Sequence, residues 1–309
     1  MWDNIKELQS TDTDVKKYIF TKGDAIAEAV LYKYGEYNKR TVMCISTQTG
    51  CEMGCTFCGT GKFFGRDLTS QEIISQVSHL IDDNSIVPDD VETMQIMVMS
   101  MGEPLLNANN LWIAFNKFHT DFPKARLLIS TSAPSTILGW ESVMQMAEKI
   151  DTVGLQFSVH ESTNEARDKI MPMKAKLNLE QIAYKGLEFY RRTSRKPYFN
   201  YCVGPNNATQ DDVDRLRMLF DPRVWEATLS VICAADESMS DAVNNNVKEV
   251  TEFSEKLIEK GFNTRVFDPA GQDDIGGGCG QLWAVQDFAN NNKNFKQSAG
   301  NKIHIKSMY

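Results

Sequence analysis

The chain has 309 residues, 42% of them hydrophobic, and a formal net charge of −8. This size suffices for one large barrel or two smaller domains. No apolar run approaches the roughly 20 residues of a membrane-spanning helix, which excludes a helical membrane protein. The negative net charge excludes nucleic-acid binding through bulk charge alone. Basic segments such as Arg191–Lys196 are still compatible with an RNA partner.

Short β-branched apolar runs alternate along the chain with segments of helical period. Such alternation predicts a parallel sheet with right-handed crossovers. We expect a full or partial β/α barrel, because no glycine fingerprint of a nucleotide-binding fold follows the first strand. The predicted strands are Thr41–Ser46, Thr93–Ser100, Arg126–Ser130, Thr152–Ser158, Tyr198–Val203, Thr228–Cys233 and Asn263–Phe267. The predicted helices are Ser70–Ile81, Glu141–Lys149, Leu179–Thr193, Asp211–Leu219 and Asn246–Lys260, and Thr69 with Glu72 forms a capping box for the first.

Cysteine usage indicates the compartment. The chain has seven cysteines, an odd number, and three of them are clustered at the spacing of metal ligands, which argues against a secreted disulfide scaffold. The N-terminus lacks the charged-then-apolar pattern of a signal peptide. We therefore expect a cytoplasmic protein.

The clustered cysteines, Cys51, Cys55 and Cys58, follow the first predicted strand with the spacing C-x-x-x-C-x-x-C. Three such thiolates can hold three irons of a cubic [4Fe–4S] cluster and leave the fourth iron open. An open iron can bind the amino and carboxylate groups of S-adenosylmethionine (SAM) and release a 5′-deoxyadenosyl radical from it. Zinc is the alternative, but it prefers four ligands, often in two C-x-x-C pairs, and only one such pair occurs here.

Polar residues follow the next three predicted strands, at the end of a β/α barrel where chemistry takes place. Gly102 and Glu103 follow the second strand, Ser130 ends the third, and Ser158 and His160 end the fourth. Glu103 could accept a hydrogen bond from the amino group of SAM. The serines and the histidine could hold its carboxylate and ribose, or could be ordinary strand-end serines and a half-buried histidine.

Four cysteines lie outside the cluster motif. Cys44, Cys202 and Cys233 lie in apolar strands, where a buried structural role is the default. Cys279 differs, because glycines at 276–278 and 280 surround it. A flexible backbone of this kind would let a thiol approach a ligand closely.

These motifs resemble those of the RlmN/Cfr family of radical-SAM RNA adenosine methyltransferases. The resemblance extends from about Glu28 to Leu282 and implies a partial (β/α)6-type radical-SAM barrel over residues 41–285. A short N-terminal extension over 1–40 would pack on the barrel, and a tail would cover 286–309. The motifs that carry the resemblance are Cys44-Ile-Ser-Thr-Gln-Thr-Gly-Cys51, Met101-Gly-Glu-Pro-Leu-Leu-Asn107, Ile129-Ser-Thr-Ser132, Phe157-Ser-Val-His160, Arg167-Asp-Lys-Ile-Met-Pro172, Asp273-Asp-Ile and Cys279-Gly-Gln-Leu282.

The resemblance also implies roles for the remaining residues. Cys279 would take a methyl group from one SAM and become S-methylcysteine. A second SAM, cleaved on the cluster, would supply the radical that takes a hydrogen from that methyl. The resulting methylene radical would add to an adenine ring carbon, carbon-2 rather than carbon-8. Cys44 would then form a disulfide with Cys279 and release the methylated base, with Glu28 as a carboxylate that assists near the adenine.

The implied partners are an rRNA or tRNA substrate, an electron donor such as flavodoxin or ferredoxin, and a thiol reductant, and we expect a monomer. Only about 27 residues precede Glu28, where family members usually carry an accessory domain that helps to hold the RNA. Ala234–Glu237 stands where members tend to have an Asn-Pro-Phe-type segment that contacts SAM. Two alternatives remain open: a radical-SAM enzyme for a small molecule or peptide, and a non-enzymatic iron–sulfur protein that binds RNA or senses redox state.

Overall fold

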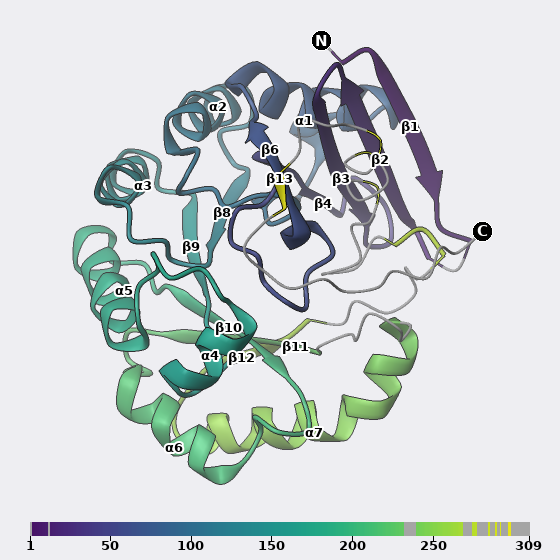
Figure 1. The fold of residues 1–309 in the computed structure, drawn as a ribbon. Coiled ribbons are helices and arrows are strands. Elements are labelled where there is room, and N and C mark those ends of the chain that lie inside the picture. The colour runs from purple at the N-terminus through teal and green to yellow at the C-terminus, as the bar shows by residue number, and fades with distance from the viewer. Residues whose placement is uncertain are drawn as a thin grey trace.

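A ten-stranded sheet is the framework of the computed structural model, which describes residues 2–11, 13–231, 239–267, 274–276, 284, 288, 291, 296 and 297 (Figure 1). Seven neighbouring strands are parallel and follow one another in sequence order. They are β4 (Arg40–Cys44), β7 (Thr93–Val98), β8 (Arg126–Thr131), β9 (Val153–Ser158), β10 (Tyr198–Val203), β11 (Glu226–Val231) and β12 (Thr264–Val266).

A helix connects each parallel strand to the next and lies on the outer side of the curved sheet (Figure 1). This arrangement confirms a partial (β/α)6 barrel. Among the described residues, no helix is long and apolar enough to span a membrane. The connecting helices are α1 (Ser70–Asp83), α2 (Ala108–Asp121), α3 (Ile137–Lys149), α5 (Leu179–Thr193), α6 (Gln210–Leu219) and α7 (Met239–Glu259), and the short α4 (Asn164–Ile170) precedes α5.

The seven predicted strands are present, each within two residues of its predicted ends. The five predicted helices are present too, although α3 and α7 begin earlier than predicted. Helix α2 was not predicted. It buries Leu111, Ala114, Phe115 and Phe118 at helical spacing, but the side chain of its N-cap residue, Asn107, makes no capping bond. Asn is a residue type often found at N-caps, so the sequence offered a start signal for this helix that the prediction did not use.

The N-terminal strands β1 (Asn4–Gln9), β2 (Val15–Lys22) and β3 (Ala25–Lys33) were not predicted either. They extend the sheet beyond β4 as antiparallel neighbours. Eight of the nine residues of β3 are buried, so the strand lacks the alternation of apolar and polar residues that marks a half-exposed strand. Its alanines and its glutamate also have low strand propensity.

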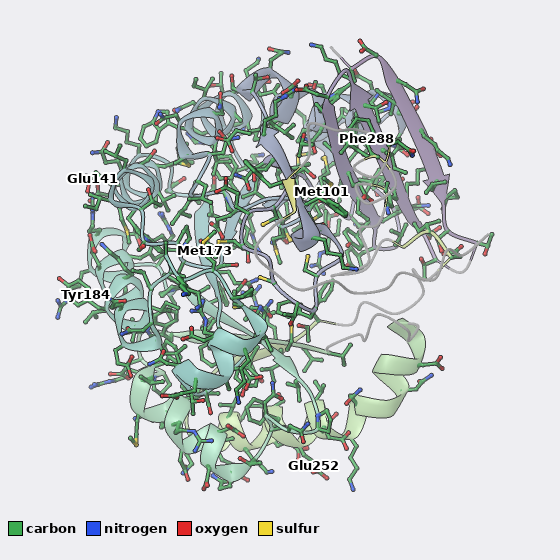
Figure 2. The ribbon with its side chains drawn as sticks, viewed as in Figure 1. Met101, Glu141, Met173, Tyr184, Glu252 and Phe288 are labelled. Carbon is green, nitrogen blue, oxygen red and sulfur yellow. The ribbon has the colours of Figure 1, made fainter. Side chains whose placement is uncertain are left out.

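This N-terminal part of the sheet has apolar contacts on both faces. Ala27, Ala29 and Leu31 of β3 join the main core beneath the helices. The opposite face, which we call the inner face, carries a second apolar cluster, in which Met101 and Phe288 lie close together (Figure 2). Its buried members are Val15, Ile26, Val30, Tyr32, Val42, Cys44, Met101 and Ile275.

A small second sheet lies beside the cysteine motif. It contains β5 (Gln48–Gly50), β6 (Phe63–Asp67) and β13 (Lys296–Gln297), with β6 in the middle. The short 3-10 helix η1 (Thr60–Lys62) leads from the cysteines into β6, and a second one, η2 (Pro88–Asp90), precedes β7. Strands β5 and β6 therefore hold the two ends of the loop that carries the cysteines.

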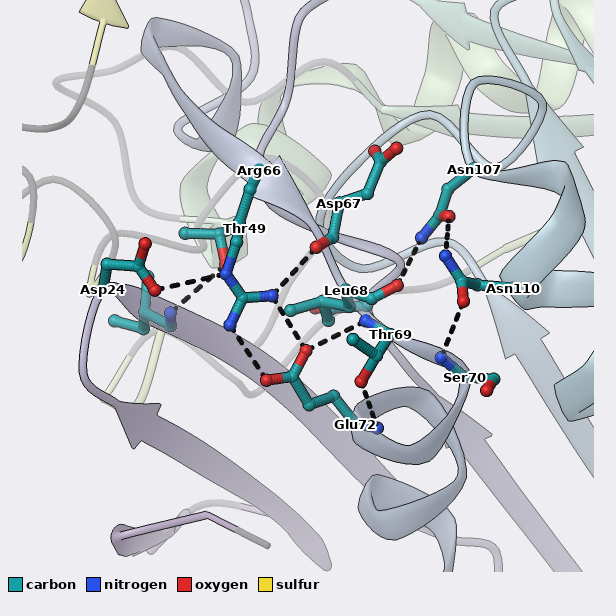
Figure 3. A network of polar contacts seen from close by, with 12 residues as sticks. Asp24, Thr49, Arg66, Asp67, Leu68, Thr69, Ser70, Glu72, Asn107 and Asn110 are labelled. Atoms are coloured by element: carbon teal, nitrogen blue, oxygen red, sulfur yellow. Dashed lines mark hydrogen bonds and ion pairs between the residues drawn. The ribbon is translucent and has the colours of Figure 1, made fainter.

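Arg66 of β6 fixes this loop to helix α1 (Figure 3). Its guanidinium donates two hydrogen bonds of 2.9 Å to the Glu72 carboxylate and a third of 3.2 Å to Asp24. Glu72 also accepts from the backbone N–H of Thr69, while the Thr69 hydroxyl accepts from the backbone of Glu72. The predicted capping box is thereby confirmed. Burial acts to raise the pKa of Glu72, but the bonds from Arg66 and Thr69 outweigh it and lower the pKa to about 2.

Replacing Glu72 with Gln tests this connection, because Gln can still cap the helix but carries no charge for Arg66. Since the folded-state pKa lies below the ordinary value of 4.5, the carboxylate stabilises the fold above that pH and loses this effect as the pH falls towards 2. We expect Glu72→Gln to lower the free energy of unfolding by roughly 1–2 kcal/mol at pH 7. In parallel urea titrations, the difference in the free energy of unfolding between the variant and wild type should be about 1 kcal/mol smaller at pH 4 than at pH 7. A difference that did not change with pH would contradict this assignment.

Candidate functional site

The carboxyl ends of the parallel strands meet at one edge of the barrel, and the predicted polar residues lie there. The cysteine motif occupies the loop between β5 and η1. The backbone N–H of Cys51 donates to the carbonyl of Phe63 at 2.7 Å, and that of Thr56 donates to the carbonyl of Ile170 at 2.9 Å. The loop is thus fixed to β6 on one side and to the end of α4 on the other.

Two further contacts shape the cysteine loop. The ring of Phe57, between the last two cysteines, packs edge-on against His160 with the ring centres 5.2 Å apart. A Cβ at Gly61 would come within 3.0 Å of the backbone nitrogen and oxygen of Cys55. Such a contact is tighter than nearly all real Cβ contacts, so a larger residue would push this return of the chain away from Cys55.

The three thiols of the motif act on one another electrostatically. Burial, together with the charge of neighbouring thiols, raises the pKa of Cys51 well above its usual range and that of Cys55 to about 12. Thiolates at Cys51 and Cys55 would therefore need a positive partner, which the irons of a cluster would supply. In the part of the chain that the structure describes, no three His, Cys, Asp or Glu side chains are grouped around one metal ion. A cubic cluster needs no such grouping, since each thiolate binds its own iron, and three cysteines on one loop are the donor set that a [4Fe–4S] cluster takes.

Glu103 lies buried in the loop that follows β7. Its carboxylate accepts hydrogen bonds from the Thr131 hydroxyl at 2.6 Å, the Ser132 N–H at 2.7 Å and the Leu105 N–H at 3.1 Å. Burial raises its pKa to about 7, although these bonds act in the other direction. Three bonds leave roughly one of four acceptor positions on the carboxylate for a ligand.

Gly102 sets the course of the chain into Glu103. Its φ of +101° belongs to the region that favours glycine. A Cβ there would lie 2.6 Å from the Cβ of Gln48. Gln48 in turn accepts a 2.9 Å hydrogen bond from the N–H of Glu103. The glycine is therefore needed for the close approach of β5.

Sequence analysis assigned no role to Arg167, which is almost fully buried on α4. Its guanidinium donates to the carbonyls of Ser132 at 2.8 Å, Ser158 at 3.0 Å and Leu177 at 3.0 Å. Burial lowers its pKa to about 10, while the nearby Cys55 and Glu103 act in the opposite direction. In the sequence it resembles a surface residue, because exposed charged residues, Asp168 and Lys169, follow it.

Ser130, Ser158 and His160 lie at the ends of their strands as predicted. The Ser130 hydroxyl accepts from the Gln156 amide at 3.3 Å, and the Ser158 carbonyl accepts from Arg167. His160 has a φ of +62° and its Nδ1 accepts from the backbone N–H of Cys202 at 3.2 Å. Burial and then Arg167 lower its pKa to about 3, so the ring is neutral, and the bond at Nδ1 assigns the hydrogen to Nε2.

Asn107 is a second residue to which the sequence assigned no role. Its side-chain amide donates to the carbonyls of Thr47 and Leu68, both at 2.7 Å, and so joins the two flanks of the cysteine loop. Figure 3 shows the bond to Leu68. Asn110 donates to the Asn107 side chain at 2.8 Å and accepts from the N–H of Ser70. An asparagine after a Gly-Glu-Pro turn carries no sequence signal for such a role.

Glu28 and Cys44 lie on adjacent strands of the inner face. Val30 of β3 pairs with Cys44 of β4, and Glu28 lies two residues before Val30 on the same side of the strand. Ile275 packs against the same face. Cys233, Cys279 and the segment 234–237 lie outside the described residues.

No protein-family model matches the chain. A curated relative from Finegoldia magna, described as a probable dual-specificity RNA methyltransferase RlmN, is 30% identical over 281 residues, covering 90% of this chain and 77% of the relative. A dual-specificity RNA methyltransferase RlmN from Lawsonia intracellularis is 31% identical over 294 residues, covering 90% and 78%. A ribosomal RNA large subunit methyltransferase N from Nitrosopumilus maritimus is 29% identical, covering 90% and 79%.

The fold has a counterpart among solved structures. A radical SAM methyltransferase from Sphaerobacter thermophilus superposes with a TM-score of 0.73 at 23% identity, covering 90% of this chain and 80% of that one. The likeness supports the partial barrel. The sequence identity to RlmN proteins extends over most of both chains and confirms the resemblance of the motifs. The chain therefore belongs to the RlmN family of radical-SAM RNA methyltransferases.

Proposed function

We propose that this protein methylates a ring carbon of an adenosine in rRNA or tRNA, at carbon-2 rather than carbon-8, through a methylated cysteine. Membership of a radical-SAM methyltransferase family supports SAM and a [4Fe–4S] cluster as cofactors. One observation carries the proposal further. Cys44 and Glu28 share the inner face, and Ile275, four residues before Cys279, packs against it.

The chemistry of adenine explains why a radical is required. The ring carbons are electron-poor and cannot displace a methyl group from a sulfonium ion. When bound, the cluster and SAM supply a 5′-deoxyadenosyl radical, which can take a hydrogen atom from a methyl group held on the protein. The task of the chain is to hold that methyl beside the base and to keep water out.

Cys279 is the proposed methyl carrier, and Cys44 is the proposed resolving thiol. Gly276, whose carbonyl accepts a hydrogen bond from Lys17 on the inner face, precedes Cys279 by three residues. Three residues of extended chain span roughly 10 Å. Cys44 is buried at the end of β4, where a thiol can attack the Cys279 sulfur and form a disulfide as the methylated base departs. An external thiol reductant then reduces the disulfide and restores both cysteines. An external electron donor supplies electrons to the cluster.

The strand ends supply the proposed SAM site. Glu103 keeps one acceptor position for the SAM amino group, and Gly102 gives its backbone the required turn. The neutral His160 offers an Nε2 hydrogen to a SAM oxygen, and Ser130 and Ser158 end the neighbouring strands. In this proposal Cys51, Cys55 and Cys58 hold the cluster beside these residues.

Deuterium labelling tests the proposed function. Unmodified rRNA and tRNA would be incubated with the reduced enzyme and SAM that carries three deuterium atoms on its methyl group. A methyl that loses one hydrogen atom to a radical and regains one from solvent reaches the adenine with two deuterium atoms. We expect nucleoside mass spectrometry to find this product on a ring carbon. A product with three deuterium atoms, or methylation of an exocyclic nitrogen, would contradict the radical route.

Replacing Cys44 with Ala tests the resolving thiol. The variant should still methylate Cys279 but leave the RNA attached to it, because nothing displaces the carbon–sulfur bond. We expect release of methylated RNA to fall by about 100-fold or more, with a covalent RNA–protein species on denaturing gels.

Cys202→Ala is the matched control, since this buried thiol contacts Ser230 at 3.3 Å on the far strands of the barrel. It should release product as wild type does. Undiminished release by Cys44→Ala would remove Cys44 from the mechanism.

A further inference from the structure

The buried side chain of Lys17 on β2 has no role in the site described above. It is 3% exposed, and its ammonium group forms an ion pair with the carboxylate of Glu28, which is completely buried. The same ammonium donates a 3.1 Å hydrogen bond to the carbonyl of Gly276. Lys17 therefore connects a strand of the N-terminal sheet, the Glu28 carboxylate and the segment that leads to Cys279.

Strand register places these groups on one surface. Lys17 lies opposite Val30, Val30 lies opposite Cys44, and Cys44 lies beside Met97. Directly paired residues point to the same side of a sheet, so these four form one row across β2, β3, β4 and β7. Glu28 lies diagonally across from Lys17, within reach of a long side chain.

Stability alone is a poor reason for this pair. Removing two charges from water costs several kcal/mol per ion, which roughly offsets their attraction, so replacing a buried pair with apolar residues is often neutral or stabilising. A purely structural pair would also satisfy the rest of the carboxylate. Lys17 forms its ion pair with Oε2, but neither Oε1 nor Oε2 has a hydrogen-bond partner among the described residues.

The unsatisfied oxygen indicates a ligand. A carboxylate oxygen accepts a hydrogen bond or a proton. The cluster on the inner face is apolar, and the nearby hydroxyls of Ser46 and Ser100 donate to the backbone carbonyl of Glu28 instead of to its carboxylate. Adenine offers an amino group for such a bond, and its ring carbon must lose a proton when the new carbon–carbon bond replaces its carbon–hydrogen bond. An acceptor beside Cys44 suits both requirements.

The segment 274–276 is held on the same side. The Asp274 carboxylate accepts from the backbone N–H of Thr11 at 2.6 Å and from its hydroxyl at 3.1 Å. Ile275 is buried in the inner-face cluster. Lys17 completes these contacts through Gly276, so a single ammonium group fixes both the acceptor and the chain that carries the methyl group.

We propose that Lys17 is a positioning residue, which aims the free oxygen of Glu28 at the adenine and aligns it with the Cys279 segment. The inference rests on the proposed function. Without Lys17, the radical would still form, but the base and the methyl group would meet less often. Radical formation would then become uncoupled from RNA methylation.

The test is the ratio of 5′-deoxyadenosine released to nucleoside methylated, measured on cluster-loaded protein. For Lys17→Met we expect this ratio to rise about tenfold over wild type. Partial unfolding would lower both products together and leave the ratio unchanged. Lys16→Met is the matched control, because the neighbouring Lys16 points away from the inner face and pairs with Glu7 at 3.1 Å; its ratio should equal that of wild type.

The double variant Lys17→Met/Glu28→Gln separates position from stability. It leaves no buried charge unpaired, so we expect its thermal unfolding midpoint to regain whatever the Lys17→Met variant loses. Its ratio of 5′-deoxyadenosine released to nucleoside methylated should stay above that of wild type. If Lys17→Met does not fold, the same ratio is measured on the double variant in its place. An unchanged ratio in Lys17→Met overturns the role of Lys17, and a wild-type ratio in the double variant overturns the roles of both Lys17 and Glu28. Absence of methylated RNA with the wild-type protein overturns the proposed function, and this inference with it.

Discussion

The buried guanidinium of Arg167 is the interaction on which the candidate site depends most. It holds the chain after β8 and the end of β9 through the carbonyls of Ser132 and Ser158, and it is the cation next to the Glu103 carboxylate and the Cys55 thiol. Desolvation opposes a charge in this place, as its lowered pKa of about 10 indicates. The carbonyl oxygens compensate for the lost water. This cation therefore allows buried groups that carry or acquire negative charge to lie close together at the carboxyl ends of the parallel strands, although the chain has an overall charge of −8.

A second buried cation, Lys17, pairs with Glu28, the residue that is proposed to act on the adenine. The parallel strands carry the cysteine motif and the proposed SAM-binding residues, whereas the antiparallel strands β2 and β3 carry Lys17 and Glu28. The inner face joins the two halves, because Cys44 of the first parallel strand pairs with Val30 of β3. The N-terminal strands are therefore continuous with the barrel sheet and form one wall of the proposed site.

The parallel strands were predictable because each is a short apolar run rich in β-branched residues, and their order follows from the crossover rule. The cysteine motif and Glu103 were found because their residue types and spacing are distinctive. Arg167 was missed, since only the folded chain reveals that one charge in a run of charged residues is buried. Strand β3 was missed because burial on both faces removes its alternation. The pairing of Lys17 with Glu28 depends on register, which hairpin geometry sets and composition does not reveal.

The central claim is that Cys44 and Cys279 meet on the inner face. Mapping of disulfide-linked peptides tests it most directly: the anaerobic, cluster-loaded protein is treated with a mild thiol oxidant, digested without reduction and analysed by mass spectrometry. The account predicts that the cluster protects Cys51, Cys55 and Cys58 and that a Cys44–Cys279 peptide is the main product. Failure to form this bond while Cys279 pairs with Cys202 or Cys233 instead would contradict the account.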